Sequence, residues 1–314
     1  MTRSLVRTTL ASVLLFACNP VQAASHAAAA RLASDPPTVK QMKVNGVDLA
    51  YIEQGSGVPV VFVHGAVGDW RTFDLLRPAV AARYRYVAYS RRYHYPNRWS
   101  GDGSDYSYQL HENDLVAFIK ALGAGPVHLV GNSYGGGIVV LTALDHPELV
   151  KSAVIGEPGS LFPDLISDQP EGKVVLAERA VAGREMREAA RAGDMDRAAE
   201  LLGDSISGEA GAFRKFPEER RRRVLENART MGPMLAQRPP PTISCAAIGA
   251  VRVPVLVVRG ERTIPFYAMT TDAFFRCLPP GNREAVIPNA GHPQYAANPV
   301  AYTDTLLGYL ALHP

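Results

Sequence analysis

Ser133 lies at the centre of the sequence Gly-Asn-Ser-Tyr-Gly, which matches the pattern Gly-x-Ser-x-Gly. An apolar run at 126–131 predicts a strand before it, and the following run predicts a helix that ends before Pro147. In such a strand–turn–helix, the glycines allow close backbone approach and the serine hydroxyl is exposed at the carboxyl end of the sheet. The free N–H groups at the start of the helix favour negative charge. We therefore interpret Ser133 as a nucleophile rather than as a small residue in a tight turn.

The C-terminal region contains a candidate general base. His292 lies in the sequence Pro-Asn-Ala-Gly-His-Pro, between the last expected strand and the last expected helix. A loop at this point reaches the same edge of a parallel sheet as Ser133, so an imidazole there can take the proton of the serine hydroxyl. We therefore pair His292 with Ser133.

A loop after the first buried strand is the expected site of an oxyanion hole. The sequence Val-Phe-Val-His-Gly-Ala ends at Ala66. We assign the hole to the backbone N–H groups of Ala66 and Tyr134, which would donate to a carbonyl oxygen as it gains negative charge. His64 in the same loop is expected to brace the loop rather than to react.

The sequence around these residues alternates between strands and helices. Continuous β-branched runs, such as the one at 58–65, are typical of parallel strands that are covered on both faces. The alternation predicts an α/β fold with a doubly wound, mostly parallel sheet. The pair Asn45-Gly46, between two alternating runs, predicts a β-hairpin near the start of the sheet.

A long helical segment without strand signals interrupts this alternation. Residues 160–248 are charged and amphipathic, and we expect them to form a cap inserted between two strands of the sheet. The predicted organisation is therefore a signal peptide at 1–23, a linker at 24–37, an α/β core at 38–159 and 249–314, and a helical cap at 160–248.

The three motifs together resemble those of the α/β-hydrolase family, in particular esterases and lactonases with a serine nucleophile and a helical cap. They extend over nearly the whole chain after the linker, in the family's order of nucleophile, acid and histidine. The resemblance implies hydrolysis of a carboxylic ester or lactone through an acyl-enzyme intermediate on a Ser-Glu-His triad, with no cofactor. The sequence departs from the family at 89–101, where Tyr-Ser-Arg-Arg-Tyr-His-Tyr-Pro-Asn-Arg-Trp-Ser-Gly replaces the usual Asp-x-Arg-Gly-x-Gly-x-Ser.

The acid of the triad is absent from its most common position. In the family it usually lies three residues after the glycine that closes the penultimate strand, here Gly260, and that position is Thr263. Zearalenone lactonases are similar in using a glutamate at the preceding strand tip, 24 residues after the serine, and Glu157 lies 24 residues after Ser133. An acid at either tip can hold the histidine in its working tautomer. We favour Glu157, with Glu261 as the alternative.

Other reactions remain open at this point. A serine at the turn argues against the haloalkane dehalogenases and epoxide hydrolases of similar fold, which have an aspartate there. Carbon–carbon bond hydrolases and perhydrolases resemble the chain at the level of these motifs, and a non-catalytic ligand-binding homologue could share the fold. The sequence has no metal-ligand spacing, phosphate-binding loop or dinucleotide fingerprint.

The N-terminal residues predict export. Residues 1–23 contain Arg3 and Arg7, then an apolar run, then small residues before Ala24, as in a cleaved signal peptide. Lipidation at Cys18 is a less favoured alternative, and the apolar run is shorter than the roughly 20 residues of a spanning helix. The formal net charge of +3 falls to +1 without the two arginines, which gives no electrostatic reason for nucleic-acid binding.

Two cysteines remain after cleavage, Cys245 and Cys277. An exported protein permits a disulfide bond between them. Two buried free thiols fit the sequence equally well, because spacing alone does not establish the geometry of a disulfide.

The cap sequence leads to two expectations about the substrate. Apolar residues predict an apolar pocket for a small ester or lactone between the cap and the sheet. They are Leu161, Phe162, Leu165, Met231 and Met234. The run from Arg220 to Arg223 is expected to be a solvated helix face paired with Glu218, Glu219 and Glu226, rather than a site for an anionic partner.

Overall fold

The computed structural model describes residues 36–238 and 243–314. An eight-stranded sheet crosses the molecule in the order β1-β2-β4-β3-β5-β6-β7-β8, and every pairing from β4 to β8 is parallel. The strands are β1 (Lys40–Val44), β2 (Val47–Gln54), β3 (Pro59–Val63), β4 (Arg85–Tyr89), β5 (Val127–Asn132), β6 (Val150–Gly156), β7 (Val255–Gly260) and β8 (Arg283–Ile287). The prediction of a doubly wound, mostly parallel sheet is confirmed.

The predicted hairpin joins β1 and β2, which pair antiparallel. Asn45 and Gly46 form its two-residue turn with φ values of 46° and 78°. Positive φ at both central residues matches the right-handed twist of the flanking strands, which is why asparagine and glycine are favoured there. The signal peptide, the alternative of lipidation at Cys18 and almost all of the predicted linker lie outside the described residues.

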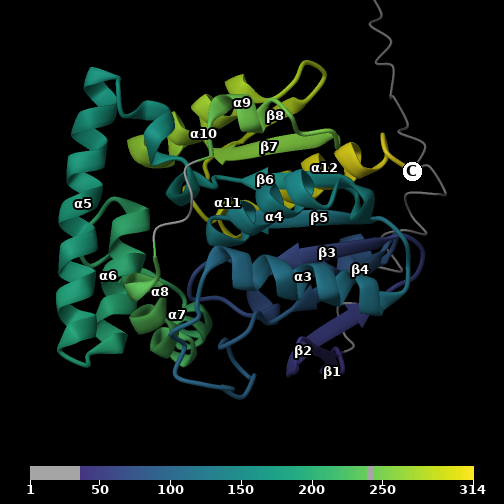
Figure 1. The fold of residues 1–314 in the computed structure, drawn as a ribbon, viewed down its shortest axis with the longest axis horizontal. Helices are drawn as coiled ribbons and strands as arrows, with labels where there is room; N and C mark the ends of the chain where they lie inside the picture. The colour runs from purple at the N-terminus through teal and green to yellow at the C-terminus, as the bar shows by residue number, and fades with distance from the viewer. Residues whose placement is uncertain (1–35, 239–242) are drawn as a thin grey trace, which may run out of the picture.

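Helices cover both faces of the sheet (Figure 1). They are α2 (Arg77–Ala81), α3 (Tyr108–Leu122), α4 (Tyr134–Asp145), α9 (Cys245–Ile248), α10 (Pro265–Cys277), α11 (Gln294–Ala297) and α12 (Pro299–Leu310). One apolar core packs α3 and α4 against the sheet, and the other packs α2 and α12 against it. Neighbouring residues of β3 divide between these cores, with Val61 in the first and Phe62 in the second, as expected for a strand buried on both faces.

The inserted segment between β6 and β7 is helical. It contains α5 (Pro170–Arg191), α6 (Met195–Ser207), α7 (Glu218–Glu226) and α8 (Met231–Ala236). In Figure 1 these helices lie together on one side of the sheet, beyond the carboxyl ends of the parallel strands. They have a small apolar core of their own, which includes Met186, Leu202 and Met231. The cap therefore covers the edge at which the candidate catalytic residues were expected.

The cap is fastened to the rest of the protein through Asn227, which is fully buried. Its side-chain oxygen accepts a hydrogen bond from the backbone N–H of Tyr95 at 2.8 Å, and its amide donates to Asp69 at 2.9 Å. The segment that departs from the family motif thus packs against the cap. Leu161 and Phe162 contribute to the main core beside α3 and α4, not to a pocket under the cap.

A disulfide bond joins Cys245, at the start of α9, to Cys277, at the end of α10. The structure thus contains the disulfide, one of the two alternatives that the sequence left open. It holds the end of the inserted segment to a helix of the core. Within residues 36–238 and 243–314, no helix combines the length and the apolar character needed to cross a membrane.

Candidate active site

Ser133 lies in the sharp turn between β5 and α4. Its φ of 57° and ψ of −125° place a residue with a side chain in a strained backbone conformation, which costs about 1–3 kcal/mol. The flanking glycines are required by close contacts. A Cβ at Gly131 would lie 2.5 Å from the carbonyl oxygen of Gly135, and one at Gly135 would lie 2.1 Å from that of Val63. The turn therefore has the geometry expected of a Gly-x-Ser-x-Gly nucleophile motif.

The structure brings Glu157 and His292 into direct contact. The Nδ1 atom of His292 lies 2.6 Å from Oε2 of Glu157. Both side chains are buried, with 3% and 0% of their surfaces exposed. An ionised carboxylate only accepts hydrogen bonds, so the imidazole proton in this pair belongs to Nδ1, which leaves Nε2 free to accept one.

Two further donors hold the Glu157 carboxylate. The backbone N–H of Gly260 donates to Oε1 at 2.7 Å, and the hydroxyl of Thr263 donates to Oε2 at 2.9 Å. Thr263 occupies the position where the family usually has its acid, and here it binds the acid of the neighbouring strand. Together with His292, these two donors fix the position of the Glu157 carboxylate.

Glu261 is placed differently. Its side chain is exposed, and its carboxylate accepts a hydrogen bond from the backbone N–H of Asn289 at 2.7 Å. The structure therefore puts Glu157 beside His292 and turns Glu261 towards a surface loop.

Ser133 and His292 line the same cavity, of about 90 Å³. Ala66 and its neighbour Gly65 form another part of the wall. A Cβ at Gly65 would lie 3.4 Å from the Cβ of Ser133, so this loop passes directly beside the serine. Tyr134 is the first residue of α4. The two backbone positions assigned to the oxyanion hole therefore flank Ser133.

Tyr267 is a residue of this site that the sequence did not single out. Its ring stacks on the imidazole of His292, with centroids 3.8 Å apart and planes 16° apart. Its hydroxyl accepts a hydrogen bond from Arg179 of the cap at 3.2 Å. Burial raises the pKa of Tyr267, so the hydroxyl keeps its proton at neutral pH. In the sequence it resembles any other aromatic core residue of an amphipathic helix.

Arg91 is a second missed residue, and it lies in the segment that departs from the family motif. Its buried guanidinium donates to the carbonyl oxygens of Gly65 at 2.9 Å and Ala66 at 3.4 Å. The Arg91 backbone N–H also donates to Nε2 of His64 at 3.0 Å. Burial, followed by the charge of Arg91, lowers the pKa of His64 well below its usual value. His64 is thus a neutral residue bonded to the backbone of the replacement segment, as its expected bracing role requires.

The cap residues over the cavity differ from those expected. The cap contributes Leu202, Ile206 and Val224 to the apolar part of the wall. None of the five apolar residues predicted for the pocket lines it. Met231 is buried inside the cap, because its face of α8 packs against α6.

The expectation for the arginine run is wrong at two positions. Arg220 and Arg223 line the cavity with Ser133 and His292. Among the described residues, neither forms an ion pair with a carboxylate; Glu226 instead pairs with Arg71 at 2.5 Å. The cause is the rotation of α7, which turns these two side chains towards the sheet edge. The sequence shows the helix but not the direction that each face takes.

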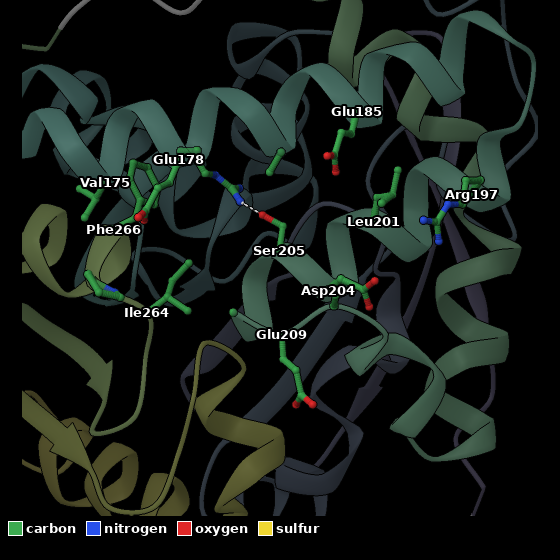
Figure 2. Close-up of a pocket in the computed structure, with 15 residues that line it drawn as sticks. Val175, Glu178, Glu185, Arg197, Leu201, Asp204, Ser205, Glu209, Ile264 and Phe266 are labelled. Carbon is green, nitrogen blue, oxygen red and sulfur yellow. Dashed lines mark hydrogen bonds between the residues drawn. The ribbon is translucent and has the colours of Figure 1, made fainter.

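A second cavity, of about 500 Å³, lies between α5, α6 and the start of α10 (Figure 2). Glu178, Glu185, Asp204 and Glu209 give its wall an acidic character, and neither Ser133 nor His292 reaches it. Arg179 borders it, with its guanidinium bonded to the hydroxyl of Ser205 (Figure 2). In the part of the chain that the structure describes, no cluster of three or more histidine, cysteine or acidic side chains has an arrangement that could hold a metal ion.

The sequence matches the model of a family described as "Alpha/beta hydrolase family" over residues 60–305. It is 29% identical over 135 residues to a 2-hydroxymuconate semialdehyde hydrolase from Pseudomonas sp. (strain CF600), a match that covers 41% of this chain and 47% of that protein. The chain spans about half the length of the curated relatives it matches.

Solved structures of similar fold cover most of the chain. An esterase from Thermogutta terrifontis, solved with malate bound, is 20% identical, with a TM-score of 0.68 over 89% of this chain and 100% of that one. Est816, described as an N-acyl homoserine lactone degrading enzyme, is 22% identical, with a TM-score of 0.68 over 86% of this chain and 100% of that one. At this level of identity the likeness concerns the fold.

Proposed function

Because the chain belongs to the α/β hydrolase family, we propose that it hydrolyses a small carboxylic ester or lactone through an acyl-enzyme on Ser133. The observation that carries the proposal is the contact of 2.6 Å between Nδ1 of His292 and Glu157, in a site where His292 shares a cavity with Ser133. Such an arrangement of nucleophile, base and orienting acid supports covalent catalysis.

In the first half of the reaction, Oγ of Ser133 attacks the carbonyl carbon and its proton passes to Nε2 of His292. Glu157 stabilises the imidazolium that forms. The carbonyl oxygen becomes an oxyanion, which accepts hydrogen bonds from the backbone N–H groups of Ala66 and Tyr134. When the tetrahedral intermediate collapses, the carbon–oxygen bond to the leaving group breaks and the alkoxide takes the proton from His292.

In the second half, water replaces the alcohol. Nε2 of His292 takes a proton from the water as it attacks the acyl carbon, and the same oxyanion hole receives the second tetrahedral intermediate. Collapse breaks the bond to Ser133, whose oxygen recovers the proton from the imidazolium. The products are a carboxylic acid and an alcohol, joined in one molecule when the substrate is a lactone.

Labelling with a fluorophosphonate tests the nucleophile. Wild-type protein should become labelled at Ser133, and Ser133→Ala should not. A panel of short esters and lactones then tests the reaction. Unlabelled wild-type protein would instead favour a ligand-binding homologue without catalysis.

A second reaction has some support. The match to a 2-hydroxymuconate semialdehyde hydrolase favours carbon–carbon bond hydrolysis on the same triad, and perhydrolysis uses the same nucleophile. Carbon-linked ketones added to the panel test the first alternative, and hydrogen peroxide as the acceptor in place of water tests the second. Turnover of carbon-linked ketones without ester hydrolysis would replace the leading proposal.

We further propose that the protein is exported. The signal-like residues 1–23 support this, and the disulfide between Cys245 and Cys277 is typical of an oxidising compartment. N-terminal sequencing of the exported protein should begin near Ala24. An intact N-terminus on protein from the cytoplasmic fraction would contradict export.

A further inference from the structure

We propose that Arg220 and Arg223 form a carboxylate subsite inside the catalytic cavity, so that the substrate is an ester carrying a free carboxylate a few bonds from the scissile carbonyl. This inference rests on the proposed ester hydrolysis at Ser133 and adds a substrate class to it. It revises the sequence-based expectation of an apolar substrate.

The two arginines reach the cavity from a single helix. They lie three residues apart on α7, and side chains at this spacing share one face of a helix. Both line the cavity that contains Ser133 and His292. Burial is the main cause of the shifted pKa values of Arg220, His64 and Tyr295, and the positive charge of Arg223 acts to lower each of them. Tyr295 also borders the cavity. A group bound between the arginines therefore lies in the same small space as the nucleophile.

No carboxylate of the described residues neutralises this pair. The guanidinium of Arg220 lies over the ring of Phe216, 3.6 Å from its centroid. Arg223 donates one long hydrogen bond, of 3.4 Å, to the carbonyl oxygen of Arg71. Glu226 pairs with Arg71, and Glu218 and Glu219 are exposed at the start of α7. Most guanidinium N–H groups of Arg220 and Arg223 are therefore available to donate hydrogen bonds to a ligand.

Two neighbouring cations without a counter-charge destabilise a partly enclosed site. Burial and the charge of Arg223 lower the pKa of Arg220, which reflects this cost. A bound carboxylate removes the repulsion and accepts charge-assisted hydrogen bonds from both guanidinium groups. Arginine suits this purpose because its planar donors match the two oxygens of a carboxylate.

The size of the cavity limits the rest of the substrate. A volume of about 90 Å³ is far below the roughly 300–1,000 Å³ of sites for drug-sized ligands. Leu202, Ile206 and Val224 add apolar surface to the wall that Arg220, Arg223 and Ser133 share. A few methylene groups fit this description. The larger cavity under α5 suits an anion less well, because its four acidic side chains outnumber its two arginines.

The test compares esters that differ only in charge. Monoethyl malonate, succinate and glutarate are each paired with the ethyl ester of the corresponding monoamide, which has nearly the same shape and no charge. O-acetylglycolate and acetoxyacetamide test a carboxylate on the leaving group. For the best pair, we expect the wild-type kcat/KM to be about 100-fold higher for the anion, as two charge-assisted hydrogen bonds would give.

Variants on the same helix locate the effect. Arg220→Gln and Arg223→Gln should each reduce the preference by about tenfold, mainly through KM for the anion, and the double variant should remove it. Arg222→Gln is the matched control, because Arg222 is exposed on α7 and does not line the cavity. It should keep the wild-type preference. Melting temperatures show whether each variant is folded.

Two outcomes would overturn the subsite: no preference for the anion in any pair, or a preference that survives in the double variant. Fluorophosphonate labelling of the same preparations distinguishes failure of the subsite from failure of the proposed function. An enzyme that is labelled but has no preference for the anion is still a serine hydrolase. Calorimetric titration with succinate tests the subsite without turnover. Wild-type protein should bind succinate and the double variant should bind it at least tenfold more weakly; equal affinity, or no binding to the wild type, would contradict the proposal.

Discussion

The Nδ1 atom of His292 lies 2.6 Å from a carboxylate oxygen of Glu157, a residue directly after β6. The same oxygen accepts a hydrogen bond from Thr263, which follows β7. The carboxylate therefore comes from one strand tip, and a hydroxyl at the neighbouring tip helps to hold it. Since the two tips are adjacent in a parallel sheet, either can present an acid to the same histidine.

The first prediction moves the acid between these tips. Glu157→Gln should be almost inactive. The double variant Glu157→Gln/Thr263→Asp should have a kcat at least tenfold higher than that of Glu157→Gln. The reason is that the side chain of Thr263 already reaches the oxygen that contacts His292. Steady-state kinetics on a short ester measures the recovery. Thr263→Asp in the wild-type background is the control and should lower kcat, because two carboxylates would then lie side by side.

The second prediction concerns Tyr267. Tyr267→Phe removes the hydroxyl that accepts a hydrogen bond from Arg179 but keeps the ring on His292, so kcat should fall by less than about tenfold, the effect of one hydrogen bond. Tyr267→Ala also removes the stacked ring and should cost more. An alanine variant with the same kcat as the phenylalanine variant would show that the stack does not position the imidazole.

The third prediction concerns Arg91, which we regard as a positioning residue. Its bond to the carbonyl of Gly65 polarises the peptide group whose N–H belongs to Ala66, one of the two proposed oxyanion donors. Arg91→Lys should therefore reduce kcat by about tenfold with little change in KM, because the oxyanion forms only during the reaction. A melting temperature near that of the wild type shows that the loss is not due to unfolding. A change in KM alone would contradict this role.

The origin of these groups in the sequence differs from case to case. Ser133 and His292 lie in short motifs whose flanking strands and helices can be predicted from local patterns, and so can the sheet. Glu157 can be proposed from its position after a strand, but its contact with His292 depends on how β6 and β7 pair. Arg91 and Tyr267 act through side-chain directions set by packing. A local pattern carries no information about them.

In the cap, too, the sequence predicts the helices but not the directions of their side chains. Its helices are evident from periodicity, and Gly193 separates α5 from α6 with a φ of 81°. The orientation of α7 over the sheet edge depends on tertiary contacts such as those of Asn227 with Asp69 and Tyr95. That orientation turns Arg220 into the cavity, which is why the run of arginines could not be interpreted from the sequence.

The fourth prediction concerns acid stability. His64, His94 and His111 form a buried cluster, with ring centroids 4.6 Å apart for the first pair and 6.2 Å apart for the second. Burial, followed by the charge of Arg91, lowers the pKa of each well below the usual value. Unfolded histidine binds a proton near pH 6.5. The stability from these neutral rings is therefore complete above about pH 6.5 and is lost as the pH falls below it.

Urea unfolding at pH 7.5, 6.5 and 5.5 measures this loss, which amounts to at most about 1.4 kcal/mol per pH unit for each imidazole. His111→Leu should make the decline less steep, because it removes one of the three imidazoles. Among the described residues neither ring nitrogen of His111 has a hydrogen-bond partner, so the substitution leaves no donor or acceptor unpaired. An equally steep decline in this variant would show that the cluster does not cause the pH dependence.

We assign Glu157, and not Glu261, as the acid that acts on His292. The most direct measurement compares kcat/KM of Glu157→Gln and Glu261→Gln on one short ester, with melting temperatures to confirm that both variants fold. We expect a loss of roughly 10⁴-fold for Glu157→Gln, as for an Asp→Asn change in a serine protease triad, because an amide cannot stabilise the imidazolium and favours the wrong tautomer. Glu261→Gln should stay within a few-fold of the wild type, since its carboxylate bonds the backbone of Asn289. An active Glu157→Gln, or an inactive but folded Glu261→Gln, would contradict the assignment of Glu157 as the acid.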